Sequence, residues 1–201
     1  VDYFIGGGRK HFTKRDDKRD LLNEMSDWSF AKNLTAFDEA TKGRVGYFTS
    51  NDEPEKLLDG RRPALDEGVK SMLKKLTGKE NTPFFLMVEG SQIDWGGHAN
   101  ELDYVVSEFL DFDKAIGVAV AFVKENPNTL LIVTADHETG GLGISSGNIK
   151  TFTPSGGFVT SGHTAAMVPV FAMGVGAEQF SGIYENTAIF DKMLKVLNKT
   201  P

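Results

Sequence analysis

The sequence has no cysteine, no long apolar run and no cluster of basic residues. Without cysteine there are no disulfides and no thiolate metal ligands, so any metal ion must be held by histidine, aspartate or glutamate. No apolar run approaches the roughly 20 residues of a membrane-spanning helix, and we therefore expect no membrane span. The net charge of −6 comes from acids scattered along the chain. Because no basic cluster could neutralise phosphates, nucleic acid is not an expected partner.

The length and composition indicate one globular domain that covers residues 1–201. The chain has 201 residues, of which 40% are hydrophobic and 25% are charged, so it is long enough to bury a substantial core. The sequence has no initiator methionine, and a strand-like apolar run begins at Val1. We therefore expect the intact protein to have further sequence before this chain.

Short apolar runs alternate with helical patterns along the chain, which predicts an α/β fold. Residues 84–88 are all apolar and residues 129–135 are rich in leucine, isoleucine and valine, as in strands that helices cover on both faces. The expected architecture is a three-layer sandwich in which helices flank a mostly parallel central sheet. Residues 143–157 are rich in glycine, serine and threonine, and we expect a loop there. The expected strands are residues 1–5, 28–31, 44–48, 84–88, 129–135 and 168–173, and the expected helices are residues 21–26, 35–39, 65–76, 99–125 and 189–197.

The segment from Met87 to Asn100 concentrates residue types that bind metals. An apolar run ends at Glu89, and Asp94 and His98 follow within nine residues, before the long helical pattern begins. Ligands gather beyond the carboxyl ends of strands in open α/β sheets, so this segment is a candidate metal site. The alternative interpretation is a polar turn that only caps the following helix.

A second strand end carries the same chemistry. Asp136 and His137 directly follow another apolar run, and His163 lies in a turn of small residues. Imidazole and carboxylate ligands without thiolate suit zinc in an open site, whereas carboxylates alone suit magnesium. Asp94, His98 and His163 would make one three-ligand zinc site, and Asp136 with His137 would begin a second.

These residues, in this order and spacing, resemble the metal-site motifs of the alkaline phosphatases. The similar stretches are residues 87–90, 93–94, 98–100, 134–141 and 162–164, and the resemblance extends over nearly the whole chain, including residues 4–9 and 180–187. The resemblance implies the C-terminal part of a larger catalytic domain with the alkaline phosphatase fold. It also implies hydrolysis of phosphomonoesters with release of inorganic phosphate, two zinc ions, one magnesium ion and a periplasmic or extracellular location.

The resemblance implies a role for each candidate residue. Asp94, His98 and His163 would bind the first zinc, Asp136 and His137 the second zinc, and Glu89 the magnesium, while Trp95 would line the phosphate pocket. Two zinc ions can clamp a phosphoryl group, because one activates the attacking oxygen and the other stabilises the leaving oxygen.

The resemblance also implies that part of the active site lies outside this chain. The family's nucleophilic serine, a bridging aspartate and a phosphate-clamping arginine belong to an N-terminal half that the chain does not contain. Ser91 and Ser161 lie close to proposed ligands but lack the context of that nucleophile, so we expect them to stabilise turns. The chain alone is therefore expected to be inactive, and its expected partners are the missing half or a second copy in a homodimer.

Two alternatives stay open from the sequence. Other metallo-hydrolases and mutases of the same superfamily, such as phosphodiesterases, share the strand end at residues 134–137, and activity toward diesters would identify one. The chain could instead be a metal-binding fragment without turnover.

Overall fold

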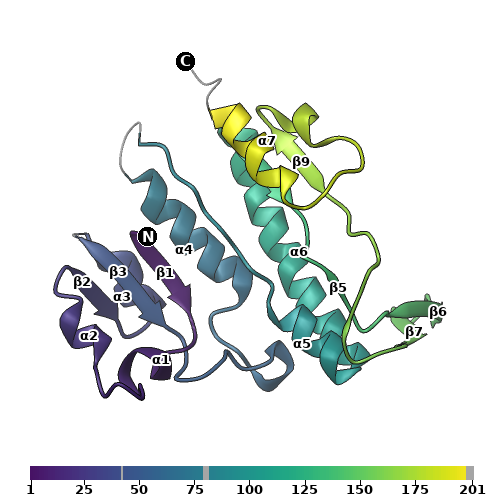
Figure 1. The fold of residues 1–201 in the computed structure, drawn as a ribbon, viewed down its shortest axis with the longest axis horizontal. Helices are drawn as coiled ribbons and strands as arrows, with labels where there is room; N and C mark the ends of the chain where they lie inside the picture. The colour runs from purple at the N-terminus through teal and green to yellow at the C-terminus, as the bar shows by residue number, and fades with distance from the viewer. Residues whose placement is uncertain (42, 79–81, 198–201) are drawn as a thin grey trace. The chain divides into compact units, whose positions relative to one another are not determined.

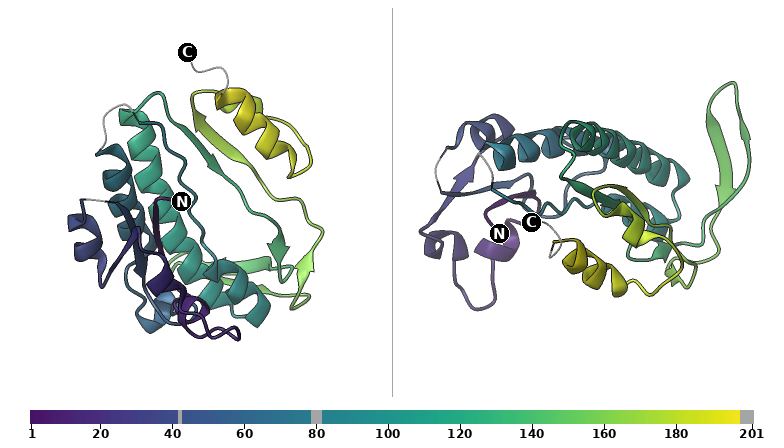
Figure 2. Two further views of the ribbon diagram at one scale, coloured as in Figure 1. Left: turned by 60° about the vertical axis from the view of Figure 1, so that its left-hand side comes forward. Right: turned by 90° about the horizontal axis from the view of Figure 1, so that it is seen from above.

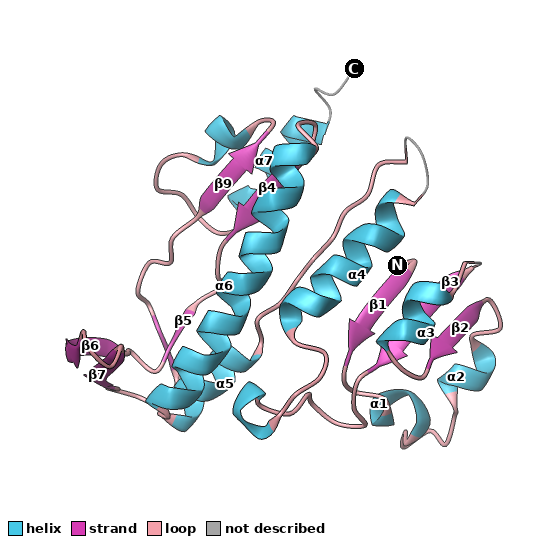
Figure 3. Cartoon of the chain, turned by 180° about the vertical axis from the view of Figure 1, so that it is seen from behind, coloured by secondary structure: helices cyan, strands magenta, loops and turns pink. Residues whose placement is uncertain are grey.

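The computed structural model describes residues 1–41, 43–78 and 82–197, which form helices and several small sheets (Figures 1 and 3). The chain divides into two compact units, Val1–Glu89 and Gly90–Pro201. Each unit is described by itself, and the single domain over residues 1–201 stays a prediction. None of the helices in the described part of the chain combines the length and apolarity that crossing a membrane requires.

The first unit contains a three-stranded parallel sheet, in agreement with the predicted α/β class. Its strands are β1 (Tyr3–Gly6), β2 (Trp28–Ala31) and β3 (Arg44–Phe48), in the spatial order β1-β3-β2. In the register, Val45 of β3 lies opposite Tyr3 on one side and Ser29 on the other. The sequence predicted β2 and β3 with these bounds.

Helices α3 and α4 supply most of the core of the first unit. Phe37 of α3, Val45 of β3 and Met72 of α4 form its buried centre. The α3 helix begins where the Asn33 side chain accepts a hydrogen bond from the Ala36 amide, which satisfies a free N–H of the first turn. The helical segments of this unit are α1 (Lys10–Thr13), α2 (Leu21–Glu24), α3 (Leu34–Glu39), the short 3-10 helix η1 (Leu57–Asp59) and α4 (Leu65–Thr77).

Lys75 of α4 caps the C-terminal end of α3, and its loss is expected to destabilise the first unit. Its ammonium donates to the carbonyl oxygens of Phe37, Asp38 (3.2 Å) and Ala40 (2.6 Å), and burial lowers its pKa. Lys75→Met keeps the aliphatic stem but removes these hydrogen bonds, so we expect the free energy of unfolding to fall by about 1–3 kcal/mol. Urea denaturation measures the loss, with exposed Lys74→Met as control; equal losses in both variants would contradict the capping role.

The second unit is built around one long helix, which packs against a pair of strands. Helix α6 (Leu102–Glu125) confirms the predicted long helix and packs against β4 (Leu130–Val133) and β9 (Phe171–Gly174) (Figure 3). These two strands pair antiparallel, so the parallel pairing lies in the first unit. The remaining helical segments are α5 (Gln92–Ala99), the 3-10 helix η2 (Ala177–Phe180) and α7 (Ala188–Leu197).

Two further strand pairs lie between β4 and β9 in the sequence. Strand β5 (Glu138–Thr139) pairs antiparallel with β8 (His163–Thr164). Between them, β6 (Gly143–Asn148) and β7 (Thr153–Gly157) form a hairpin, which Figure 2 shows as a narrow two-stranded ribbon. The hairpin is largely exposed, including the apolar side chains of Ile149 and Phe152 near its turn.

Two predictions about strands were wrong. Residues 143–157 form the β6–β7 hairpin, although their composition predicted a loop. In the described chain no strand is assigned to residues 84–88, where a fully buried strand was predicted. There, Phe85 and Met87 are exposed while their neighbours are half-buried, so burial alternates along the segment. An apolar run therefore did not distinguish a strand covered on both faces from a segment covered on one.

Candidate metal centre

Helix α5 places two of the predicted ligands on one face. Asp94 and His98 are separated by four residues, which is the spacing that brings side chains together on a helix. The sequence predicted a helix only from residue 99 onward, whereas the structure already forms two helical turns over Gln92–Ala99. The helix ends at Asn100, whose left-handed backbone (φ 56°) is a conformation that asparagine tolerates better than most residues.

The third ligand, His163, comes from a different part of the chain. It lies in β8 directly opposite Thr139 of β5, and the Gly140 amide donates to the Gly162 carbonyl at 2.9 Å beside this pair. The Glu138 carboxylate accepts from the Gly141 amide at 2.8 Å and from the Thr164 hydroxyl. These bonds hold the segment that carries His163 against the segment that carries Asp136 and His137.

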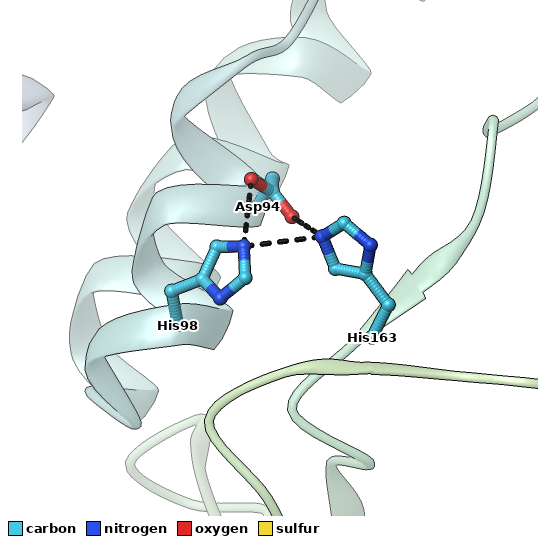
Figure 4. Close-up of side chains that lie close together, drawn as sticks. All are labelled: Asp94, His98 and His163. Carbon is cyan, nitrogen blue, oxygen red and sulfur yellow. Dashed lines mark hydrogen bonds and ion pairs between the residues drawn. The ribbon is translucent and has the colours of Figure 1, made fainter.

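Asp94, His98 and His163 point toward one another, as Figure 4 shows. The Nε2 atoms of the two histidines are 3.1 Å apart, and the Asp94 oxygens lie 3.4 Å from Nε2 of His98 and 3.7 Å from Nε2 of His163. One ligand atom from each residue lies within 4.8 Å of the others, and all three side chains are partly exposed. The predicted first ligand set is therefore assembled with its ligating atoms facing a common point.

The neighbouring backbone fixes the orientation of His98. Its Nδ1 lies 2.6 Å from the Ser161 carbonyl, which can only accept, so Nδ1 carries the proton and Nε2 presents a lone pair. With its amide nitrogen turned toward them, Asn100 donates to the carbonyls of Gly97 (2.9 Å) and Thr160 (2.8 Å). The contacts of His98 with Ser161 and of Asn100 with Thr160 join α5 to the loop before His163. Ser161 thus acts through its backbone, whereas the sequence had drawn attention to its hydroxyl.

Asp136 and His137 lie beside this group without joining it. The His137 ring stacks on the His163 ring with centroids 3.6 Å apart, and Oδ2 of Asp136 lies 3.2 Å from Nε2 of His137. The Asp136 carboxylate is 85% exposed, so it is open to a further ligand or to water. The structure therefore brings Asp94, His98 and His163 together as a group that could hold a metal ion, with Asp136 and His137 beside it.

The other predicted site residues are Trp95, Ser91 and Glu89. Trp95 follows Asp94 in α5 and its side chain is 46% exposed. Ser91 immediately precedes this helix and makes no side-chain cap. Glu89 is the last residue of the first compact unit, and its assignment to magnesium stays a prediction.

Sequence reasoning missed Thr139. Its hydroxyl contacts Oδ1 of Asp94 and lies 3.2 Å from Nδ1 of His137. The available signal was its position two residues after His137, a spacing that places two side chains on the same side wherever the backbone is extended.

Comparisons with known proteins agree on one family. A family model described as alkaline phosphatase matches residues 1–157. The solved structure of alkaline phosphatase from the Antarctic bacterium TAB5 is 42% identical and superposes with a TM-score of 0.90, covering 100% of this chain. Alkaline phosphatase 3 of Bacillus subtilis (strain 168) is 28% identical over 98% of this chain, and the repressible alkaline phosphatase of Saccharomyces cerevisiae is 35% identical over 71%.

The chain spans only part of each of these relatives. It covers 62% of the TAB5 chain, 58% of the Bacillus subtilis protein and 31% of the Saccharomyces cerevisiae protein. A solved variant of the TAB5 enzyme is described with magnesium bound in its M3 site.

Proposed function

Because this chain belongs to the alkaline phosphatase family, we propose that it supplies the first zinc site of an enzyme that hydrolyses phosphomonoesters. The observation that carries this proposal is the convergence of Asp94, His98 and His163. A tetrahedral zinc with bonds of roughly 2.05 Å needs ligand atoms about 3.3 Å apart. The two histidine Nε2 atoms are 3.1 Å apart, and each lies near a different Asp94 oxygen, Oδ2 at 3.4 Å from His98 and Oδ1 at 3.7 Å from His163, so each separation is close to that value. Imidazole with carboxylate is a suitable donor set.

The remaining metals are assigned to the neighbouring residues. We propose that Asp136 and His137 contribute to a second zinc site, supported by the approach of their ligand atoms to 3.2 Å and by the stacking of His137 on His163. Glu89 is proposed as a magnesium ligand, supported by the magnesium described in the TAB5 relative. Both sites would need further ligands.

The bound metals would supply electrostatic stabilisation of a transferring phosphoryl group. The chain's own residues would hold the metal ion in place, with His98 and His163 as neutral ligands and Asp94 as the anionic ligand. The exposed Trp95 would form part of the wall around the substrate. The substrate is a phosphomonoester and the product is inorganic phosphate. The reaction also needs a nucleophile, which we assign to sequence outside this chain.

The proposal extends to partners and location. The segment with the nucleophile is the expected partner of this chain, and a homodimer is the alternative association. A periplasmic or extracellular location is proposed from the family resemblance alone.

Metal analysis of the purified 201-residue chain tests the proposal. We expect about one tightly bound zinc per chain by mass spectrometry and calorimetry. We also expect hydrolysis of a chromogenic phosphomonoester at a rate near background, because the proposed nucleophile lies outside this chain. No bound zinc would contradict the proposed site, and hydrolysis at the rate of an intact alkaline phosphatase would contradict the assignment of the nucleophile elsewhere.

The intact protein separates the proposed function from a related one. We expect it to hydrolyse phosphomonoesters in preference to phosphodiesters. The opposite preference would indicate a phosphodiesterase of the same superfamily, and zinc binding without hydrolysis of either would indicate a metal-binding protein without turnover.

A further inference from the structure

We propose that Thr139 is a positioning residue that orients one ligand of each zinc site, an inference that rests on the proposed function. Its hydroxyl contacts Oδ1 of Asp94, which belongs to the first ligand group, and lies 3.2 Å from Nδ1 of His137, which belongs to the second. Thr139 is half-buried, and its strand is fixed by pairing with His163. One side chain therefore links the two ligand groups.

The direction of the two hydrogen bonds follows from a proton count. The Thr139 hydroxyl has one proton, and it can donate to only one of its two neighbours. The Asp94 carboxylate can only accept, so a proton pointing at His137 would leave two unprotonated oxygens facing each other. The hydroxyl therefore donates to Asp94 and accepts from Nδ1–H of His137. Nε2 of His137 is then the nitrogen with a lone pair for a cation.

Asp136 favours the opposite tautomer. Its Oδ2 lies 3.2 Å from Nε2 of His137, so in a metal-free neutral imidazole this carboxylate favours a proton on Nε2. Water competes for the Asp136 carboxylate, which is 85% exposed, whereas the Thr139 hydroxyl is half-buried. The contact with Thr139 therefore favours the His137 tautomer with its proton on Nδ1. Without the Thr139 hydroxyl, Asp136 should favour the tautomer with the proton on Nε2.

The methyl group of Thr139 has a separate packing role. A Cβ added at Gly97 of α5 would lie 3.0 Å from Cγ2 of Thr139, which indicates close packing of this strand on the helix. Thr139→Val keeps the branched shape and that methyl but removes the hydroxyl. Thr139→Ser keeps the hydroxyl and removes the methyl. The two variants therefore separate hydrogen bonding from packing.

The first test is zinc affinity of the purified 201-residue chain. We expect Thr139→Val to raise the zinc dissociation constant about 10–100-fold, as removal of an outer hydrogen bond to a ligand typically does. Thr139→Ser should restore most of the affinity. Thr153→Val in the β6–β7 hairpin removes a hydroxyl that bonds only within its own turn region and should leave zinc binding unchanged. Equal affinities of the wild-type chain and Thr139→Val would overturn the inference.

The second test reads the tautomer directly in the metal-free chain. At alkaline pH, where imidazole is neutral, ¹⁵N NMR should find the proton of His137 on Nδ1 in the wild-type chain and in Thr139→Ser. In Thr139→Val it should move to Nε2, toward Asp136. A proton on Nε2 in the wild-type chain would overturn the inference, even if the Val variant fails to fold.

The two tests also separate this inference from the proposed function. A wild-type chain that binds no zinc contradicts the proposed zinc site, while the tautomer of His137 still reports on Thr139. A chain that binds zinc equally well with and without the hydroxyl contradicts only the role of Thr139.

Discussion

Replacing Asp94 by asparagine is expected to abolish tight zinc binding while leaving the chain folded. The carboxylate is the only anion of the three-residue group and faces both histidines, at 3.4 and 3.7 Å. Asparagine has nearly the same shape but no charge, so the two imidazoles would face the cation without a balancing anion. We expect the zinc dissociation constant to rise by more than about 100-fold, the upper end for loss of an outer hydrogen bond.

The matched control for this variant is Asp103→Asn. Asp103 is exposed in the first turn of α6, close to Asp94 in the sequence. Its replacement by asparagine removes the same charge as Asp94→Asn. Calorimetric titration with zinc should distinguish the two variants, and circular dichroism should find both folded. Unchanged zinc affinity in Asp94→Asn would remove Asp94 from the ligand set. An equal loss in Asp103→Asn would attribute the effect to overall charge.

Gly174→Ala is expected to be the most destabilising single-methyl addition in the second unit. Gly174 ends β9 with φ +100°, a backbone conformation that side chains rarely adopt, and an added Cβ would lie 2.0 Å from the carbonyl oxygen of Thr129. That oxygen belongs to the backbone before β4, so it can move only if the strand pair shifts. We expect the free energy of unfolding to fall by roughly 4 kcal/mol, in the range of severe single substitutions.

Gly182→Ala separates backbone strain from the steric clash. Gly182 has nearly the same φ, +101°, but an added Cβ would meet nothing within 4 Å. Its replacement should therefore cost only the conformational strain, about 1–3 kcal/mol. Urea denaturation of both variants provides the comparison. A loss in Gly174→Ala no larger than that in Gly182→Ala would show that the strand end can yield.

The ligand types were predictable from sequence, but the way they are held was not. Asp94, His98 and His163 were identified because metal-binding residue types follow an apolar run and recur in a turn of small residues, and the resemblance implied the same grouping. The helical backbone between Asp94 and His98 was missed, since two adjacent glycines, Gly96 and Gly97, disfavour helix in isolation. In the structure these glycines are buried, and an added Cβ would meet Val105 or Thr139 at 2.9 Å. Close packing of α5 therefore outweighs its low intrinsic helix propensity.

Contacts between residues far apart in the chain could not be predicted from the sequence either. The role of Thr139 depends on β5 lying beside α5, and the tautomer of His98 depends on the Ser161 carbonyl, more than sixty residues away. Backbone atoms carry no sequence signal, so the second contact could not be predicted from residue types. The regular elements were easier, because β2, β3 and α6 each follow from a local pattern of apolar residues.

The β6–β7 hairpin lies in the sequence between β5 and β8, the paired strands that position His163. Because β5 and β8 bond directly to each other, and the Gly140 amide bonds to the Gly162 carbonyl, both ends of the intervening segment are fixed independently of its content. Each doubling in length of such a closed segment costs only about 0.6 kcal/mol of additional closure entropy. Residues 143–157 are therefore a place where sequence can be lengthened, shortened or exchanged while the ligand geometry is retained.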